Sequence, residues 1–228
     1  MTVVVGVTLT GLYTATKPQA DLNEELFNKR AILSSLGDKF DGDLTAISDE
    51  ELASIFKNQV EQFAINPEGE MVEGVLAENV KMKQEMKLPA EDRKLPVYVY
   101  TAQDKSKYYI VSVRGRGLWD AIWGNIAIAN DFNTVVGVSF DHAGETPGLG
   151  AEIKDNKAWV STFAGKTIYD DQGEYVSVSL KKGGAPPGSK HYVDGLTGAT
   201  ITGNGVSDML YDGIKSYEPY FKQVKSNN

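Results

Sequence analysis

Strand-forming runs joined by short polar turns are the feature that most constrains how this chain can fold. Residues 96–100 and 108–113 are rich in valine, tyrosine and isoleucine, and they flank a turn-forming Gln-Asp-Lys-Ser at residues 103–106. Residues 123–129 and 134–140 form a second such pair around Asn-Asp-Phe-Asn. Hairpins bring consecutive strands together antiparallel, so we expect an α+β fold, a largely antiparallel sheet with packed helices.

Three longer helices are expected from the spacing of apolar residues. Residues 21–36 place leucines on one stripe, with Asp21 positioned to cap the helix and Gly37 to end it. Ser48 begins a second helix by the capping-box pattern, because a glutamate follows three residues later. The third contains apolar residues at helical spacing, namely Val206, Met209, Leu210, Ile214 and Tyr217.

Other stretches give weaker patterns. Residues 66–93 are polar and highly charged, which indicates a solvated loop with short strands. Residues 159–163 predict a short helix. Residues 174–180 alternate apolar side chains with serine, as a half-buried strand does.

The first residues form an uncharged, mostly apolar segment. Residues 2–16 carry no charged side chain, and at about 15 residues they are shorter than the ~20 that a membrane-spanning helix needs. Three interpretations are open: the C-terminal part of a membrane anchor whose beginning is missing, a short signal-like segment, or a buried strand. No basic residues precede the segment, which disfavours the signal peptide.

Composition excludes several kinds of site. The chain has no cysteine, so it forms no disulfide, cysteine zinc site or iron–sulfur ligation of its own, and it has no thiol chemistry. Its two histidines, His142 and His191, are too few for a convincing histidine metal site. A net charge of −8 without a dense basic run argues against nucleic-acid binding. Residues 183–190 lack the Lys-Ser/Thr pair of a P-loop, and we expect them to fold back beside Thr200 instead.

Residues 194–200, Asp-Gly-Leu-Thr-Gly-Ala-Thr, carry the strongest chemical signal. Their small residues leave the backbone little shielded, and Thr200 is expected on a tight turn just before the third helix. Free backbone N–H groups and the helix dipole favour a phosphate there, which a hydroxyl can bind or carry covalently. The alternative is an ordinary helix start that Thr200 or Thr202 caps.

These residues resemble the flavinylation motif of FMN-binding domains in the Nqr and Rnf families. Three more segments fit those families in the same order: Gly-Leu-Trp at 117–119, Glu-Thr-Pro-Gly-Leu-Gly at 145–150, and Gly-Gly-Ala-Pro-Pro-Gly-Ser at 183–189. Their separations resemble those of the NqrC family of sodium-translocating NADH:quinone oxidoreductases. Thr197 stands where serine is the commoner residue. The resemblance implies an FMN joined through its phosphate to Thr200 by a separate flavin transferase.

A flavin needs apolar walls for its ring as well as an anchor for its phosphate. Leu118, Trp119 and Leu149 are the candidate walls, because each lies in a glycine-bounded turn that a flat ligand can approach closely. Core packing is the alternative interpretation of Trp119.

Polar groups nearby complete the candidate site. Thr146 can offer its hydroxyl, and Gly148 and Gly150 their backbone groups, to the phosphate or the ring. Glu145 can brace that turn, without a proton-transfer role, and Asp194 can hold its own turn through its side chain. We assign FMN binding to Thr200 as the covalent anchor, with Leu118, Trp119, Glu145, Thr146, Gly148, Leu149, Gly150, Asp194, Thr197, Gly198 and Ala199.

The resemblance also implies an organisation and a role. Residues 1–20 would belong to a membrane anchor, 21–94 to the helical and irregular first part of the soluble domain, and 95–228 to the FMN-binding domain. The chain would be an electron-carrier subunit of a sodium-pumping NADH:quinone oxidoreductase. It would lie in the bacterial inner membrane as a single-pass protein, with its soluble domain on the periplasmic side and the other Nqr subunits as partners. The alternatives are an Rnf flavoprotein subunit and a non-redox binding or scaffold domain in which Thr200 only caps a helix.

Overall fold

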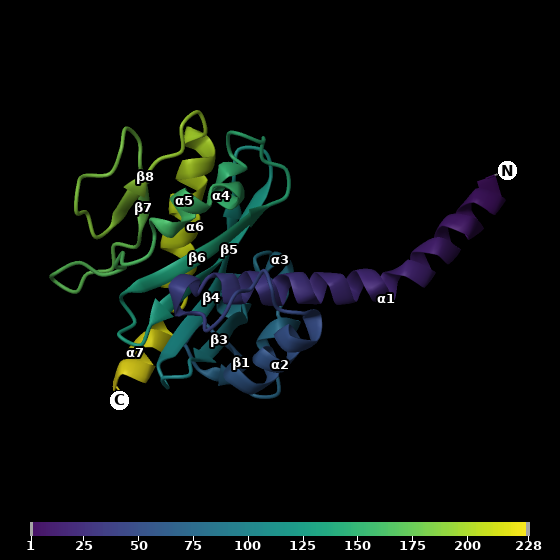
Figure 1. Ribbon diagram of the computed structural model, residues 1–228, viewed down its shortest axis with the longest axis horizontal. Coiled ribbons are helices and arrows are strands. Elements are labelled where there is room, and N and C mark those ends of the chain that lie inside the picture. Colours follow the sequence, from purple (N-terminus) through teal and green to yellow (C-terminus); the bar gives the residue numbers. More distant parts are fainter. Residues whose placement is uncertain (1, 227–228) are drawn as a thin grey trace.

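The computed structural model describes residues 2–226, and a six-stranded antiparallel sheet forms its centre (Figure 1). Met1, in the predicted anchor segment, and residues 227–228, in the predicted FMN-binding domain, lie outside the described residues. Both expected hairpins are present, and the α+β class is confirmed. In the order β2-β1-β3-β4-β5-β6, the strands are β1 Val60–Ile65, β2 Met71–Val72, β3 Leu95–Thr101, β4 Lys107–Arg116, β5 Ala121–Ala129 and β6 Val135–His142.

The two faces of the sheet bury two separate cores. Successive side chains of a strand point to opposite faces. In β3, Val97 and Val99 therefore join one core, while Tyr98 and Tyr100 join the other. The first core lies under α6 (Thr200–Lys215) and the second under the end of α1 (Thr2–Ser34) and α2 (Asp49–Gln59).

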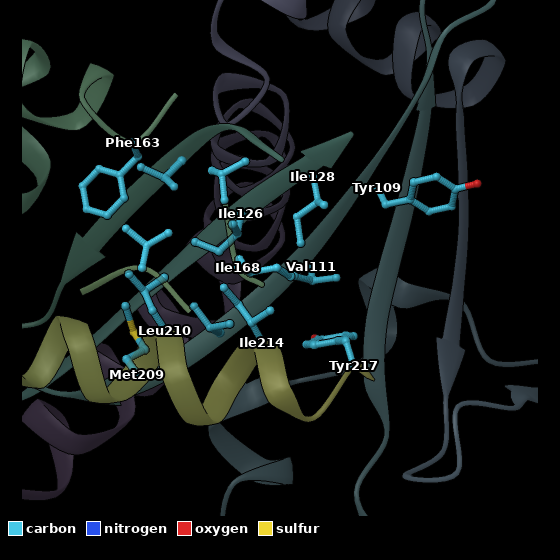
Figure 2. Close-up of a cluster of buried hydrophobic side chains, with 14 of the residues drawn as sticks. Tyr109, Val111, Ile126, Ile128, Phe163, Ile168, Met209, Leu210, Ile214 and Tyr217 are labelled. Atoms are coloured by element: carbon cyan, nitrogen blue, oxygen red, sulfur yellow. The ribbon is translucent and has the colours of Figure 1, made fainter. Parts of the chain in front are cut away.

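Helix α6 packs against β4 and supplies most of the expected helical stripe to the core (Figure 2). An added Cβ at Gly205 would lie 2.1 Å from the carbonyl oxygen of Arg116, so only glycine permits this close approach of helix to strand. The predicted helix is confirmed, but it begins at Thr200. The apolar residues named for it are all buried, namely Val206, Met209, Leu210, Ile214 and Tyr217.

Helix α1 runs without interruption for 33 residues, so the expected helix start at Asp21 is wrong. Pro18 lies inside α1, where it removes one backbone donor without ending the helix, and Figure 1 shows that α1 bends and projects away from the sheet. Gly37 turns the chain shortly after the helix with a φ of +52°. Within residues 2–226, no helix is both long enough and apolar enough to cross a membrane.

The capping box of α2 is confirmed. The Ser48 hydroxyl accepts a hydrogen bond from the backbone N–H of Glu51 at 3.2 Å, and the Glu51 carboxylate accepts one from the backbone N–H of Ser48 at 2.9 Å. Leu52 and Phe56 are buried on the inner face of α2, while Ile55 is half-buried.

Short helical turns occupy the connecting segments. The solvated stretch at 66–93 contains β2 and three such turns. The short helix expected at 159–163 begins two residues earlier, because the Asn156 side chain accepts from the backbone N–H of Trp159 at 3.0 Å and caps it. These elements are η1 Gly37–Lys39, η2 Ala77–Asn79, α3 Met82–Glu85, η3 Ala90–Asp92, α4 Glu152–Asp155 and α5 Lys157–Ser161. A further helix, α7 Glu218–Ser226, follows α6.

A second, two-stranded sheet pairs β7 (Ser179–Lys181) with β8 (Tyr192–Asp194) in parallel. The strand expected over residues 174–180 is therefore mostly wrong, since only its last two residues belong to β7. Ser177 has a φ of +61°, a left-handed conformation that ends any regular strand before Val178.

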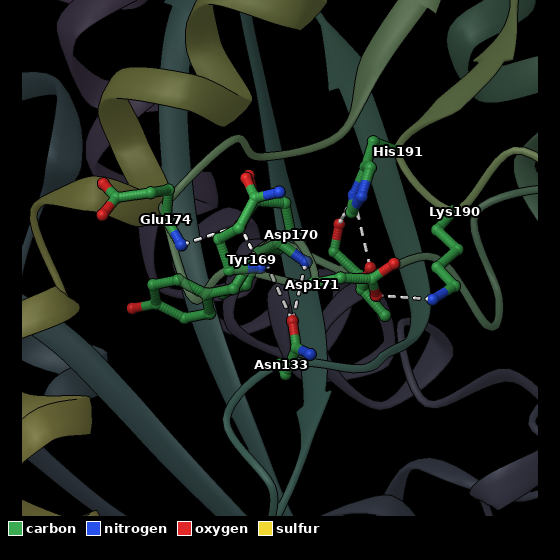
Figure 3. Close-up of polar contacts among 10 residues, drawn as sticks. Asn133, Tyr169, Asp170, Asp171, Glu174, Lys190 and His191 are labelled. Atoms are coloured by element: carbon green, nitrogen blue, oxygen red, sulfur yellow. Dashed lines mark hydrogen bonds and ion pairs between the residues drawn. The ribbon is translucent and has the colours of Figure 1, made fainter.

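A polar network holds the segment that leads into β8 (Figure 3). Asn133 Oδ1 accepts hydrogen bonds from two successive backbone amides of the loop that follows α5, at 3.1 and 2.9 Å. Lys190 pairs with Asp171 at 2.7 Å, and His191 Nδ1 lies 2.9 Å from the carbonyl oxygen of Thr167. The network thereby fixes the chain just before residues 194–200.

Candidate functional site

Thr200 is the first residue of α6, and its side chain is exposed. The residue before it, Ala199, occupies the N-cap position, and no side chain of residues 2–226 caps this helix end. The alternative in which Thr200 or Thr202 caps α6 is therefore wrong. The first backbone N–H groups of a helix have no partner within it, so this end of α6 can bind an anion.

The turn before Thr200 depends on a glycine. Gly198 has a φ of +75°, which favours glycine, and a Cβ there would lie 2.7 Å from Leu149 Cδ2. The motif at residues 194–200 therefore contacts the loop at 145–150, which lies far from it in sequence. Thr197 is exposed on the same turn.

Large apolar side chains are exposed around this helix end. Trp119 is 64% exposed, Leu118 44% and Leu149 42%, so the core-packing interpretation of Trp119 is wrong. Ile201, which sequence reasoning missed, is 58% exposed in the first turn of α6. The Trp119 ring is oriented by a hydrogen bond of 3.1 Å from its Nε1 to Thr146 Oγ1. Exposed apolar surface of this kind is typical of a ligand or interaction site.

Glu145 lies beneath this surface and is only 4% exposed. Its Oε1 accepts from the backbone N–H of Trp119 at 2.9 Å, and its Oε2 accepts from the Thr202 hydroxyl at 2.5 Å. Burial acts to raise the pKa of Glu145, but these hydrogen bonds outweigh it and hold the pKa below its usual value. The carboxylate is therefore ionised at neutral pH. We expected it to brace its own turn at 145–150, but its hydrogen bonds instead join the Trp119 turn to α6.

The loop at residues 145–150 folds tightly around that carboxylate. The Thr146 carbonyl accepts from the backbone N–H groups of Leu149 and Ala151, both at 3.1 Å, and Gly148 has a φ of +73°. Gly150 is buried against Glu145. Direct contact of Thr146, Gly148 or Gly150 with a cofactor stays a prediction.

Asp194 acts across segments and not within its own turn, so its expected local role is wrong. Its Oδ1 accepts from the backbone N–H of Ala185 at 2.7 Å, and its carbonyl oxygen accepts from Trp159 Nε1 at 2.7 Å. The first bond holds the glycine- and proline-rich loop beside the motif at 194–200.

Known proteins share this sequence and this fold. Residues 117–215 match the FMN-binding domain family. The NqrC protein of the Na(+)-translocating NADH-quinone reductase from Pseudomonas aeruginosa is 33% identical over 224 residues, which cover 91% of this chain and 85% of that protein. This chain belongs to the NqrC family of Na(+)-translocating NADH-quinone reductases. Membership of this family accounts for the order of the four sequence segments.

Other NqrC proteins are also similar to this chain in sequence and in fold. NqrC from Vibrio anguillarum is 39% identical over 153 residues, which cover 62% of this chain and 59% of that protein. The chain spans less than two thirds of the length of this relative and of the Vibrio campbellii one, at 59% and 65%. The crystal structure of NqrC from Parabacteroides distasonis superposes with a TM-score of 0.77 at 32% identity, covering 90% of this chain and 96% of that one.

Proposed function

We propose that this NqrC family member carries FMN in phosphoester linkage to Thr200 and relays electrons within a sodium-pumping NADH:quinone oxidoreductase. The observation that carries the proposal is an exposed threonine hydroxyl at the uncapped start of a 16-residue helix. That helix lies within the segment that matches the FMN-binding domain family.

The residues present fit FMN. Backbone N–H groups at the start of α6 suit its phosphate, while Leu118, Trp119 and Leu149 suit its ring. Bound FMN supplies the electron-accepting chemistry that the side chains of this cysteine-free chain lack. Thr146, Gly148, Asp194, Thr197, Gly198 and Ala199 complete the proposed surroundings.

The covalent attachment is a phosphoryl transfer and requires no oxidant. The Thr200 oxygen forms the new bond to the flavin-side phosphorus of a flavin dinucleotide, the phosphoanhydride bond of that donor breaks, the nucleoside monophosphate leaves, and the hydroxyl proton is released. We propose that a separate flavin transferase performs this step, because Thr200 is exposed and has no general base among its hydrogen-bond partners within residues 2–226.

We further propose that α1 belongs to a single-pass anchor in the bacterial inner membrane, with the sheet domain on the periplasmic side and the other Nqr subunits as partners. Its threonine hydroxyls donate to backbone carbonyls one turn earlier, as in Thr8 to Val4 at 2.8 Å and Thr10 to Gly6 at 2.9 Å. Hydroxyls satisfied within the helix cost less in an apolar environment. This feature supports an anchor.

The decisive experiment is co-expression of the chain with a flavin transferase, followed by intact mass and visible absorbance after denaturation. The wild-type chain should gain one covalently bound flavin, and Thr200→Ala should gain none. Ser216→Ala is the matched control, since it removes an exposed hydroxyl at the opposite end of α6, outside the motif, and should leave attachment intact. A colourless wild-type chain of unmodified mass would overturn the proposal in favour of a non-redox binding domain.

A further inference from the structure

We infer that the buried hydrogen bond between Glu145 and Thr202 is the positioning device of the Thr200 site. It holds the first turn of α6 against the turn that carries Trp119. The inference rests on the proposed function, because it concerns how the anchor hydroxyl and the apolar wall are kept in place. Glu145 and Thr202 act through their neighbours and need no contact with the flavin.

One side chain connects the three segments of the site. Glu145 comes from the loop at 145–150, its Oε1 binds the backbone N–H of Trp119, and its Oε2 binds the hydroxyl of Thr202. Thr202 is fully buried, and Glu145 is 4% exposed. The Glu145–Thr202 contact is therefore shielded from water, which would otherwise compete for the carboxylate, while the contact with Trp119 is part-buried.

Two glycines make room for the carboxylate. A Cβ on Gly117 would lie 2.5 Å from Glu145 Oε1, and a Cβ on Gly150 would lie 2.3 Å from Oε2. Any larger residue at either position would displace the carboxylate from its partners. The space that Glu145 needs is therefore a sufficient reason for glycine at 117 and at 150.

Hydrogen bonds, and not a lysine or arginine partner, are the main groups that favour the charged form of Glu145. Within residues 2–226, Glu145 forms no ion pair with lysine or arginine, and the nearby His142 accepts from its backbone N–H through Nδ1 at 3.1 Å. Its carboxylate instead meets the first turn of α6, where the helix dipole stabilises negative charge. The charge therefore attracts the helix end towards the Trp119 turn.

The hydrogen bond between Glu145 and Thr202 also fixes the backbone at Thr200, because the two threonines are close together in α6. Thr202 lies two residues after Thr200 in the same helical turn, so holding the Thr202 hydroxyl also fixes the backbone that presents the Thr200 hydroxyl. Trp119 is fixed from the other side by the same carboxylate. The distance between the Thr200 hydroxyl and the Trp119 ring therefore depends on Glu145.

The test measures the rate of FMN attachment with limiting transferase in full-length variants. Thr202→Val keeps the shape of threonine but removes its hydroxyl, and Glu145→Gln removes the charge. Each should slow attachment by roughly tenfold, as expected for a lost hydrogen bond to a charged group. Thr202→Ser retains the hydroxyl, so this variant should attach FMN at the wild-type rate.

Tyr217→Phe is the matched control for stability. The Tyr217 hydroxyl donates to the carbonyl oxygen of Ser112 at 2.8 Å and is fully buried just beyond the other end of α6. Its loss should lower the melting temperature, yet leave the attachment rate unchanged. If Thr202→Val attached FMN as fast as Tyr217→Phe, the inference would be overturned while the proposed function stood.

A second measurement needs no flavin. The backbone N–H of Trp119 should exchange its hydrogen faster in Glu145→Gln and in Thr202→Val than in the wild type, and at the wild-type rate in Tyr217→Phe. Unchanged exchange in the first two variants would overturn the inference even if the wild type never acquired FMN. In that case the proposed function would have failed separately.

Discussion

The helices α2 and α6 differ at their N-termini, because side chains of residues 2–226 cap the free backbone N–H groups of α2 but not those of α6. At α2, Ser48 and Glu51 form a reciprocal capping box, and three acidic residues lie in the first turn. At α6, Ala199 offers no capping group, and the first turn contains no acidic residue. The first helix end is completed by its own side chains, whereas the second is left open to an external anion.

An open helix start requires stabilisation from elsewhere. An absent cap costs about 1 kcal/mol, whereas burial of one large apolar side chain contributes about 1.5–3 kcal/mol. Helix α6 buries several such side chains against β4, and Gly205 permits their close approach. The face of α6 therefore keeps the helix folded, so its start can serve a ligand.

The largest expected effect comes from a clash that would push α6 away from β4. Gly205→Ala would place a methyl group against the Arg116 carbonyl oxygen, and we expect a loss of about 2–3 kcal/mol in the free energy of unfolding. Gly203→Ala in the same helix meets only the flexible end of Leu180 at 3.3 Å and should be close to neutral. Urea unfolding measures both. Equal stability of the two variants would contradict the packing argument.

Removal of the α2 cap should lower the free energy of unfolding by less than Gly205→Ala does, and it should leave flavin attachment unchanged. Ser48→Ala leaves the backbone N–H of Glu51 without its hydroxyl partner, and we expect a loss of about 1 kcal/mol in the free energy of unfolding. Flavin attachment at Thr200 should be unaffected, because α2 packs on the opposite face of the sheet. A slower attachment in this variant would contradict the separate roles of the two helix starts.

Acid should remove the stability that Glu145 gives to the α6 end. The pKa of Glu145 is lowered in the folded chain, so its ionised form adds stability above the ordinary value of 4.5. That stability is lost as pH falls through the lower, folded pKa. Unfolding measured at pH 7 and at successively lower pH should show a smaller acid loss in Glu145→Gln than in the wild type. Parallel curves would contradict the ionised state of Glu145.

The smallest effect on stability is expected at Trp119. This side chain is 64% exposed, so Trp119→Ala should change the free energy of unfolding by less than about 0.5 kcal/mol. If Trp119 forms a wall of the flavin site, the fluorescence of attached FMN should still differ between variant and wild type. Identical spectra would exclude Trp119 from contact with the ring.

Local patterns were sufficient for the elements that depend on neighbours in sequence. The hairpins β3–β4 and β5–β6, the capping box at Ser48 and the apolar stripe of α6 are each encoded within a few residues. Pro18 and Ser177 show where such patterns fail. A proline inside a helix and a left-handed serine are decided by the chain on both sides of them, which residue preferences do not reveal.

By itself, the sequence determined the fold class, the candidate motif at Thr200 and, through resemblance, the family. Only the tertiary structure decided that the start of α6 has no cap, that Trp119 is exposed, and that Glu145 binds Thr202, 57 residues away in the chain. The physical reason is that periodicity and turn chemistry act over a few residues. A buried hydrogen bond between distant segments instead depends on how the whole sheet and its helices pack.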